Sequence, residues 1–156
     1  MIYLSNSTRK YRVNLGALKR RAATLLAAAG ETDSSLSIAL VGDAAIRRLN
    51  RDHRGKDRAT DVLSFPLHAP RAKRSAQRDG RDVPERMLGD VAISLDRAAF
   101  QAAEYDAKLD AEVQRLLIHG ILHLLGHDHE APAERARMQR EERRLAASIG
   151  LRWPYS

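Results

Sequence analysis

The 156-residue chain has the composition of a globular protein, with 44% hydrophobic and 30% charged residues, which argues against a disordered chain. Its length is that of one domain, which we expect to span residues 1–156. It contains no cysteine, which excludes disulfides, thiolate zinc sites, iron–sulfur clusters and cysteine nucleophiles. A bound metal ion would therefore need histidine and oxygen ligands.

The charge is uneven along the chain. There are 27 Arg and Lys residues against 20 Asp and Glu, a net charge of +7, and residues 1–30 hold six of the basic residues and no acidic one. A basic pole of this kind favours a polyanionic partner such as a nucleic acid. Solubility, or a general bias towards arginine, would explain it equally well.

No targeting or membrane-spanning segment is evident. The first residues, MIYLSNSTRKYR, lack the cationic start and apolar stretch of a secretory signal. Apolar runs such as residues 25–29 are far too short to cross a membrane. We expect a soluble, cytoplasmic protein that does not bind membranes.

The first half of the chain predicts alternating strands and helices. A β-prone run at residues 2–4 is followed by helical apolar spacing over residues 14–29, where Gly30 suits the helix end. We predict a strand over residues 36–41 and a helix that starts at Gly42-Asp43. Residues 51–58 read as a polar loop, and residues 61–65 as a strand that Pro66 ends.

The second half begins with a polar, arginine-rich segment at residues 67–86, which predicts a long mobile loop. A strand over residues 88–94 follows, with Asp96 as a plausible cap of the next helix. The longest helical pattern covers residues 110–125 and ends at Gly126, and Pro132 opens a last helix that reaches Gly150. The mixed order of elements predicts an α+β fold.

Four of the six histidines crowd into the segment HGILHLLGHDH, residues 119–129. His119 and His123 are four residues apart on the predicted helix, so both imidazoles lie on one face. Gly126 permits a left-handed backbone that could bring His129 back towards them. Three protein ligands with an open position are typical of a catalytic zinc ion. The pattern therefore predicts one metal ion, most simply Zn²⁺, although nickel or copper could also occupy three imidazoles.

Other interpretations of this segment stay open. His127 or Asp128 could supply a fourth ligand and make the site structural. Glu112 lies seven residues before His119 and could orient a ligand, although a solvated helix residue is the simpler interpretation. The spacing H-x-x-x-H-x-x-G-x-x-H also matches metzincin peptidases, but Gly120 stands where those enzymes carry the glutamate that acts as general base.

These residues resemble the YbeY family, bacterial endoribonucleases of ribosomal RNA maturation that are also described as metal-dependent hydrolases. The resemblance rests on the histidine segment, on TDVLSFP at residues 60–66 preceded by Leu49-Asn50 and RGKD at 54–57, on GDVAIS at 89–94, and on the weaker pair Met138 and Glu142. These blocks span residues 49–142 in the order found in the family. His127 departs from the pattern, because many relatives have a tyrosine there.

The resemblance implies a mixed sheet of about four strands packed with helices, with a metal site at the end of a central helix formed by His119, His123 and His129. It also implies a cytoplasmic, zinc-dependent endoribonuclease acting on single-stranded RNA, in maturation of the 3′ end of small-subunit ribosomal RNA and in ribosome quality control. The expected partners are an rRNA precursor and the small ribosomal subunit, not DNA. The functionally important arginine of the family falls on Arg54.

The chemistry suits a phosphodiester substrate, because Arg54 could pair with phosphate beside an open metal site. The low aromatic content of 4% favours phosphate contacts over base stacking, and hence RNA binding that weakens as salt rises.

Asp61 and Asp90 read as strand-start caps or turns, and nothing supports Ser64 as a nucleophile. A non-catalytic ribosome-assembly factor with a structural zinc ion, and a metallopeptidase using Glu112 or Asp128, are the alternatives.

Overall fold

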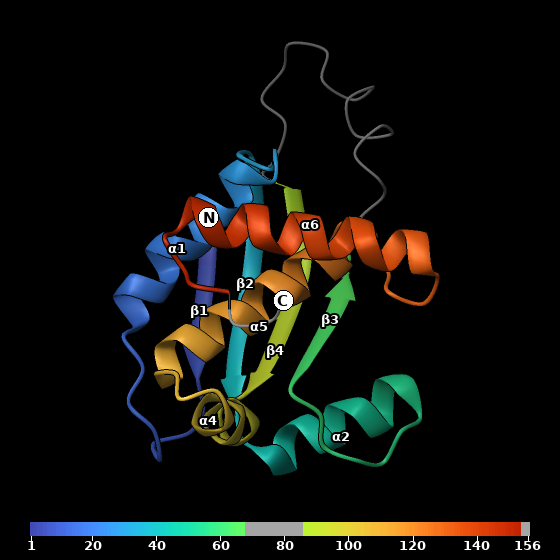
Figure 1. Cartoon of the computed structure of the whole chain (residues 1–156). Coiled ribbons are helices and arrows are strands. Elements are labelled where there is room, and N and C mark those ends of the chain that lie inside the picture. Colours follow the sequence, from blue (N-terminus) through green and yellow to red (C-terminus); the bar gives the residue numbers. More distant parts are fainter. Residues whose placement is uncertain (68–85, 154–156) are drawn as a thin grey trace.

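The computed structural model describes residues 1–67 and 86–153 of the chain. Four strands form one sheet, namely β1 (Ile2–Asn6), β2 (Ser34–Val41), β3 (Val62–Pro66) and β4 (Arg86–Ser94). The helices of the described part are α1 (Leu15–Ala28), α2 (Asp43–Arg54), α4 (Leu95–Glu104), α5 (Leu109–Leu124) and α6 (Pro132–Ser148) (Figure 1). The expected α+β fold with a mixed sheet of four strands is confirmed.

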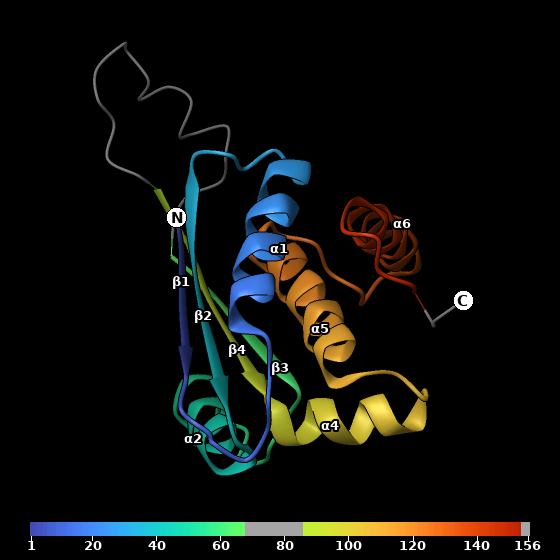
Figure 2. The same cartoon turned by 90° about the vertical axis from the view of Figure 1, so that its left-hand side faces the viewer.

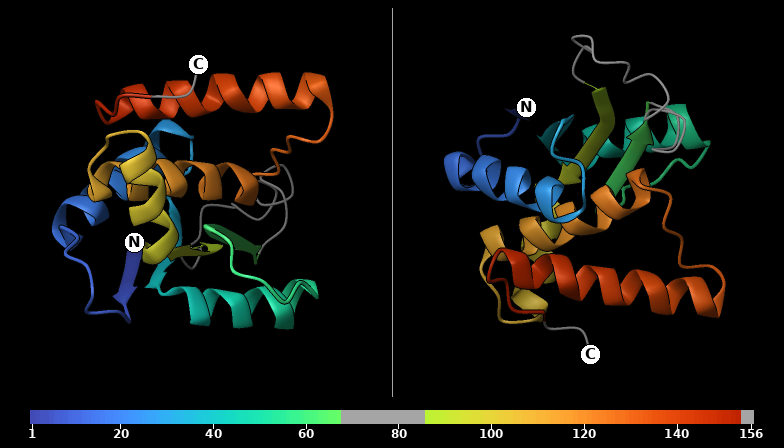
Figure 3. Two further views of the ribbon diagram at one scale, coloured as in Figure 1. Left: turned by 60° about the horizontal axis from the view of Figure 1, so that its bottom comes forward. Right: turned by 90° about the horizontal axis from the view of Figure 1, so that it is seen from above.

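The sheet has the order β1-β2-β4-β3. β1, β2 and β4 run parallel, and β3 pairs antiparallel with β4 at one edge. Figure 2 shows α1 and α5 against one face of the sheet. Figure 3 shows α5 between the sheet and α6. The last helix therefore covers the side of α5 that the sheet leaves open.

Side chains on the two faces of β2 enter two separate cores. Leu36, Ile38 and Leu40 belong to the large cluster beneath α1 and α5, whereas Val41 belongs to a smaller cluster with Ile46 of α2. This alternation follows from the two-residue period of a strand. It places α2 on the opposite face of the sheet from α5, so that the end of α2 approaches β3 from that side.

Several predicted boundaries need correction. The polar residues 51–54 continue α2, and the helix ends where Gly55 takes a left-handed conformation with φ of 69°. Their polarity was misleading because α2 buries only Ile46 and Asn50. Pro66 is still part of β3, which is an edge strand and can lose one backbone donor. The predicted loop over residues 67–86 lies, from 68 to 85, outside the described residues.

Asp96 does not cap its own helix. Ser94 is the N-cap of α4 and accepts a hydrogen bond from the backbone N–H of Arg97. Asp96 instead accepts from the backbone N–H of Asp43, at 2.8 Å, and from the Tyr11 hydroxyl, at 2.8 Å. It thus satisfies an unpaired amide at the start of α2, whose own N-cap is Gly42 without a side-chain hydrogen bond.

No helix in the described ranges is long and apolar enough to cross a membrane.

Replacing Asp96 by asparagine should lower the free energy of unfolding by about 1 kcal/mol at pH 7, because one charge-assisted hydrogen bond is lost. The hydrogen bonds from the Asp43 amide and then the Tyr11 hydroxyl lower the pKa of Asp96 below its usual value. The carboxylate therefore stabilises the fold above the unfolded-state pKa of about 3.9, and this contribution disappears as the pH falls through the lower folded-state pKa. Urea unfolding of both proteins at pH 7 and pH 3 should show the difference shrinking. A difference independent of pH would contradict the assignment.

Candidate metal centre

Two of the three predicted ligands lie on the last turns of α5. The Nε2 atoms of His119 and His123 are 3.0 Å apart, and the ring centroids are 4.5 Å apart. Two nitrogens bound to one tetrahedral zinc ion at about 2.0–2.1 Å would be separated by about 3.3 Å. The helix therefore presents both imidazoles at nearly the spacing that a shared metal ion requires.

The third ligand comes from the loop after α5. Gly126 has φ of 93°, donates to the carbonyl of His123 at 3.0 Å, and is followed by His127, whose N–H donates to Leu122 at 3.0 Å. This pair of bonds is a Schellman motif, which ends the helix and reverses the chain direction. The His129 ring then lies 5.8 Å from His119 and 5.4 Å from His123. The predicted role of Gly126 is confirmed.

One potential ligand atom from each of the three histidines lies within 4.8 Å of the others. Among the described residues, this is the one group of three histidine or acidic side chains close enough to hold a metal ion. His119 and His123 are partly buried, whereas His129 is exposed. The donor set of three imidazoles, open to solvent on one side, fits a zinc ion with a free coordination position.

Burial keeps the helix histidines neutral. Desolvation, followed by the neighbouring His123, lowers the pKa of His119 to about 4. Desolvation, followed by the neighbouring His129, lowers the pKa of His123 below its ordinary value. A neutral imidazole has the lone pair that a metal ion needs, so these two side chains are in the binding form at neutral pH.

The structure does not place His127 or Asp128 as a fourth ligand. Both line a separate cavity of about 260 Å³ together with Glu134 and Arg137. The Asp128 carboxylate is also engaged locally, since its Oδ1 accepts from the backbone N–H groups of His129 and Glu130. Among the described residues the candidate site therefore has three histidine ligands and no fourth one, as expected of an open site.

Glu112 is not the solvated helix residue that the simpler interpretation of the sequence predicted. It is buried, with 2% of its surface exposed, and forms an ion pair with Arg115. Arg115 also donates to Gln101, whose amide nitrogen donates to Asp61 at 3.1 Å. The ion pair follows from the three-residue spacing on α5, but the burial of Glu112 and the link through Gln101 to Asp61 depend on how α4 packs against α5, which the sequence does not show.

Gly120 is the position that separates this site from the metzincin pattern. A Cβ atom here would lie 2.8 Å from Cγ1 of Val91, and the Gly120 carbonyl accepts a hydrogen bond from Ser64 at 3.0 Å. The residue therefore faces the sheet, with no room for a larger side chain. A glutamate at this position could not serve as general base. The Ser64 hydroxyl is used in its hydrogen bond to the Gly120 carbonyl.

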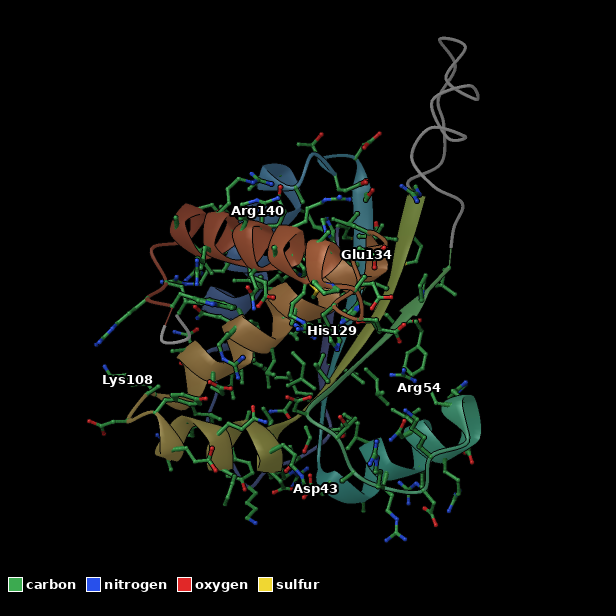
Figure 4. All side chains as sticks on the ribbon, turned by 45° about the vertical axis from the view of Figure 1, so that its right-hand side comes forward. Asp43, Arg54, Lys108, His129, Glu134 and Arg140 are labelled. Carbon is green, nitrogen blue, oxygen red and sulfur yellow. The ribbon has the colours of Figure 1, made fainter. Side chains whose placement is uncertain are left out.

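The metal ligands open into a cleft of about 750 Å³, whose other lining residues come from the end of α2 and from β3 with the segment before it: His53, Arg54, Thr60, Asp61, Val62, Ser64, Phe65 and Pro66. Arg54 is the last residue of α2, and Figure 4 shows it and His129 in the same view of the molecule. The cleft thus combines four imidazoles, those of the three candidate ligands and of His53, with the exposed guanidinium group of Arg54.

The remaining candidates divide between two clefts. Asp61 lines the metal cleft, but its Oδ1 accepts from the N–H of Val62 at 2.8 Å, as expected of a residue at the start of a strand. Asp90 lines a different groove, with Ser37 and Val91. Thr60, the first residue of the TDVLSFP block, also lines the metal cleft, as does His53, which the sequence analysis did not single out. The position of His53 next to Arg54 was the available signal.

Comparison with known proteins agrees with the geometry. The profile of the family described as Endoribonuclease YbeY matches residues 3–150 of the chain. The chain belongs to this family. Endoribonuclease YbeY of Geobacter sulfurreducens is 38% identical over 150 residues, which cover 95% of each chain. The solution structure of TM1509 from Thermotoga maritima has 25% sequence identity and a TM-score of 0.56, and covers 94% of this chain and 90% of that one.

A second relative shows that the lengths differ within the family. Endoribonuclease YbeY of Anaeromyxobacter sp. (strain Fw109-5) is 52% identical over 134 residues, or 86% of this chain. The match covers only 64% of that relative's length, and the same share of its counterpart from Anaeromyxobacter dehalogenans.

Metal titration should distinguish three ligands from four. We expect the wild type and the variant His127→Ala to bind one Zn²⁺ per chain with affinities within a factor of about 3, because His127 lies outside the cluster. His123→Ala should bind at least 100-fold more weakly, because it retains two imidazoles. Competition with a chromophoric chelator measures all three. Equal weakening by both substitutions would show that His127 is a ligand.

Proposed function

We propose that this protein is a zinc-dependent endoribonuclease that cleaves single-stranded RNA. Its proposed place is the cytoplasm, in maturation of the 3′ end of small-subunit ribosomal RNA and in ribosome quality control, with an rRNA precursor and the small subunit as partners. The observation that carries the proposal is the cleft itself, in which the three clustered histidines and Arg54 face the same space. Membership of the YbeY family supports the choice of RNA as substrate.

The residues of the cleft have distinct roles in this proposal. His119, His123 and His129 would hold the zinc ion, which when bound supplies Lewis-acid polarisation of a phosphoryl oxygen. Arg54 is exposed at the rim and can donate two parallel hydrogen bonds to phosphate oxygens. Its charge would stabilise the negative charge that develops on the phosphate during cleavage.

Two described groups of the cleft could act as a general base, the imidazole of His53, whose ring lies beside Phe65, and the carboxylate of Asp61. Asp61 is the one carboxylate among its described lining residues, and both of its oxygens already accept hydrogen bonds, from Val62 and from Gln101. Two nucleophiles are compatible with this arrangement, a water molecule and the 2′-hydroxyl of the RNA. Attack by the 2′-hydroxyl leaves a cyclic 2′,3′-phosphate, so the product ends distinguish the two.

The proposal is tested with end-labelled single-stranded RNA and three proteins purified in parallel. We expect the wild type and His127→Ala to cleave the RNA, and His123→Ala to be inactive, because it lacks a metal ligand. The inactive variant also reports contamination by other nucleases. Equal cleavage by all three would mean that the activity is not this protein's. No cleavage by any of them would favour a non-catalytic ribosome-assembly factor.

Arg54→Met should reduce the rate constant of cleavage by about 100-fold, the loss typical of removing one group that stabilises charge in the transition state. Arg48→Met is the matched control, since Arg48 is an exposed residue of the same helix that does not line the cleft. It should change the rate by less than about threefold. Single-turnover cleavage at several RNA concentrations separates binding from the chemical step. An effect of Arg54→Met on RNA binding alone would assign it to substrate binding only.

A further inference from the structure

His129 is held differently from the other two metal ligands. His119 and His123 are partly buried on a helix, whereas His129 is exposed and lies in the loop between α5 and α6. An exposed loop residue would ordinarily have to be ordered when the metal ion binds, at a cost in conformational entropy. Something must therefore fix this loop if the site is to be preformed.

The side chain of Arg135 fixes it from α6. Its Nε donates to the carbonyl of His129 at 3.0 Å, and its Nη2 lies 3.5 Å from the carbonyl of Glu130. Arg135 belongs to the first turns of α6, whose position is set three residues later by the buried Met138. The guanidinium group therefore connects a packed helix to the backbone of the ligand loop.

The N–H side of the same backbone is also engaged. Oδ1 of Asp128 accepts from the N–H groups of His129, at 2.6 Å, and of Glu130, at 3.2 Å. Asp128 holds the donors of these two residues and Arg135 holds their acceptors. Both amides and both carbonyls of the segment are thus satisfied before any metal ion binds, although the segment is exposed to water.

We propose that Arg135 is a positioning residue for His129, and that it raises the metal affinity of the site without touching the metal. The inference rests on the proposed three-histidine metal site but not on RNA cleavage. The direction in which zinc affinity changes when Arg135 is replaced by a neutral residue distinguishes positioning from an effect of charge. A cationic side chain near a divalent cation would weaken metal binding by repulsion, so an effect of charge alone would make a neutral variant bind metal more tightly. Positioning makes the neutral variant bind more weakly.

The test compares Zn²⁺ affinity, by competition with a chromophoric chelator, in Arg135→Met, Arg135→Lys and Arg140→Met. Arg140 is an exposed arginine further along α6 and controls for the loss of one charge (Figure 4). We expect affinity to fall about 10-fold in Arg135→Met, the lower end of the usual loss for a group that supports a metal ligand. Arg135→Lys should lie between it and the wild type, and Arg140→Met should match the wild type.

A double-mutant cycle shows whether Arg135 acts through His129. In the background of His129→Ala, the added substitution Arg135→Met should leave the weakened zinc affinity unchanged, because the ligand that it positions is gone. Cobalt gives an independent readout, since the visible absorption of bound Co²⁺ should weaken in Arg135→Met and not in Arg140→Met. Unchanged or tighter zinc binding by Arg135→Met would overturn the proposal, as would an equal loss in both backgrounds. If the wild type bound no zinc, both the proposed metal site and the proposed role of Arg135 would be wrong.

Discussion

The burial of α5 is the constraint on which the site depends. Residues on almost every side of this helix are buried, against the sheet on one side and beneath α6 on another. Gly120 allows a close approach to the sheet, since a single added carbon would meet Val91. With its rotation and height fixed in this way, the helix can direct His119 and His123 only towards β3. The same packing desolvates the two imidazoles and so keeps them neutral.

The functional groups come from elements of very different rigidity. The two helix histidines are partly buried on α5, Arg54 ends a helix on the other face of the sheet, and His129 belongs to a surface loop. The small cluster around Ile46 and Leu63 joins α2 to the sheet and so holds the helix that carries Arg54. Because α5, α2 and the loop after α5 all contribute to it, the cleft beside the edge strand has a fixed side with the candidate metal ligands and an exposed cationic rim. This arrangement suits a long, flexible polyanion better than a small enclosed ligand.

The sequence predicted those features that depend on local spacing. The four-residue separation of His119 and His123, the turn at Gly126 and the alternation in β2 all follow from the geometry of helix and strand. It did not predict features that depend on tertiary packing. Asp96 caps α2 instead of its own helix because the starts of α2 and α4 lie side by side, and Glu112 is buried because Arg115 accompanies it. The direction of His127, away from the cluster, was equally invisible, because neighbouring residues of a loop can point into different cavities.

The same packing that builds the metal site also separates it from peptidase chemistry. In the metzincin pattern a carboxylate one residue after the first histidine activates water. Here that position is Gly120, which packs against the sheet and leaves no room for a side chain. Within the described residues, the remaining carboxylate of the cleft, that of Asp61, is held by two hydrogen bonds from the fold. A peptide supplies no nucleophile of its own, so its hydrolysis would lack the glutamate that activates water in the metzincin pattern. An RNA strand carries a hydroxyl beside every phosphate, and its phosphates offer the charge that Arg54 can bind. The loss of the base therefore excludes the usual peptidase mechanism while leaving phosphodiester cleavage chemically possible.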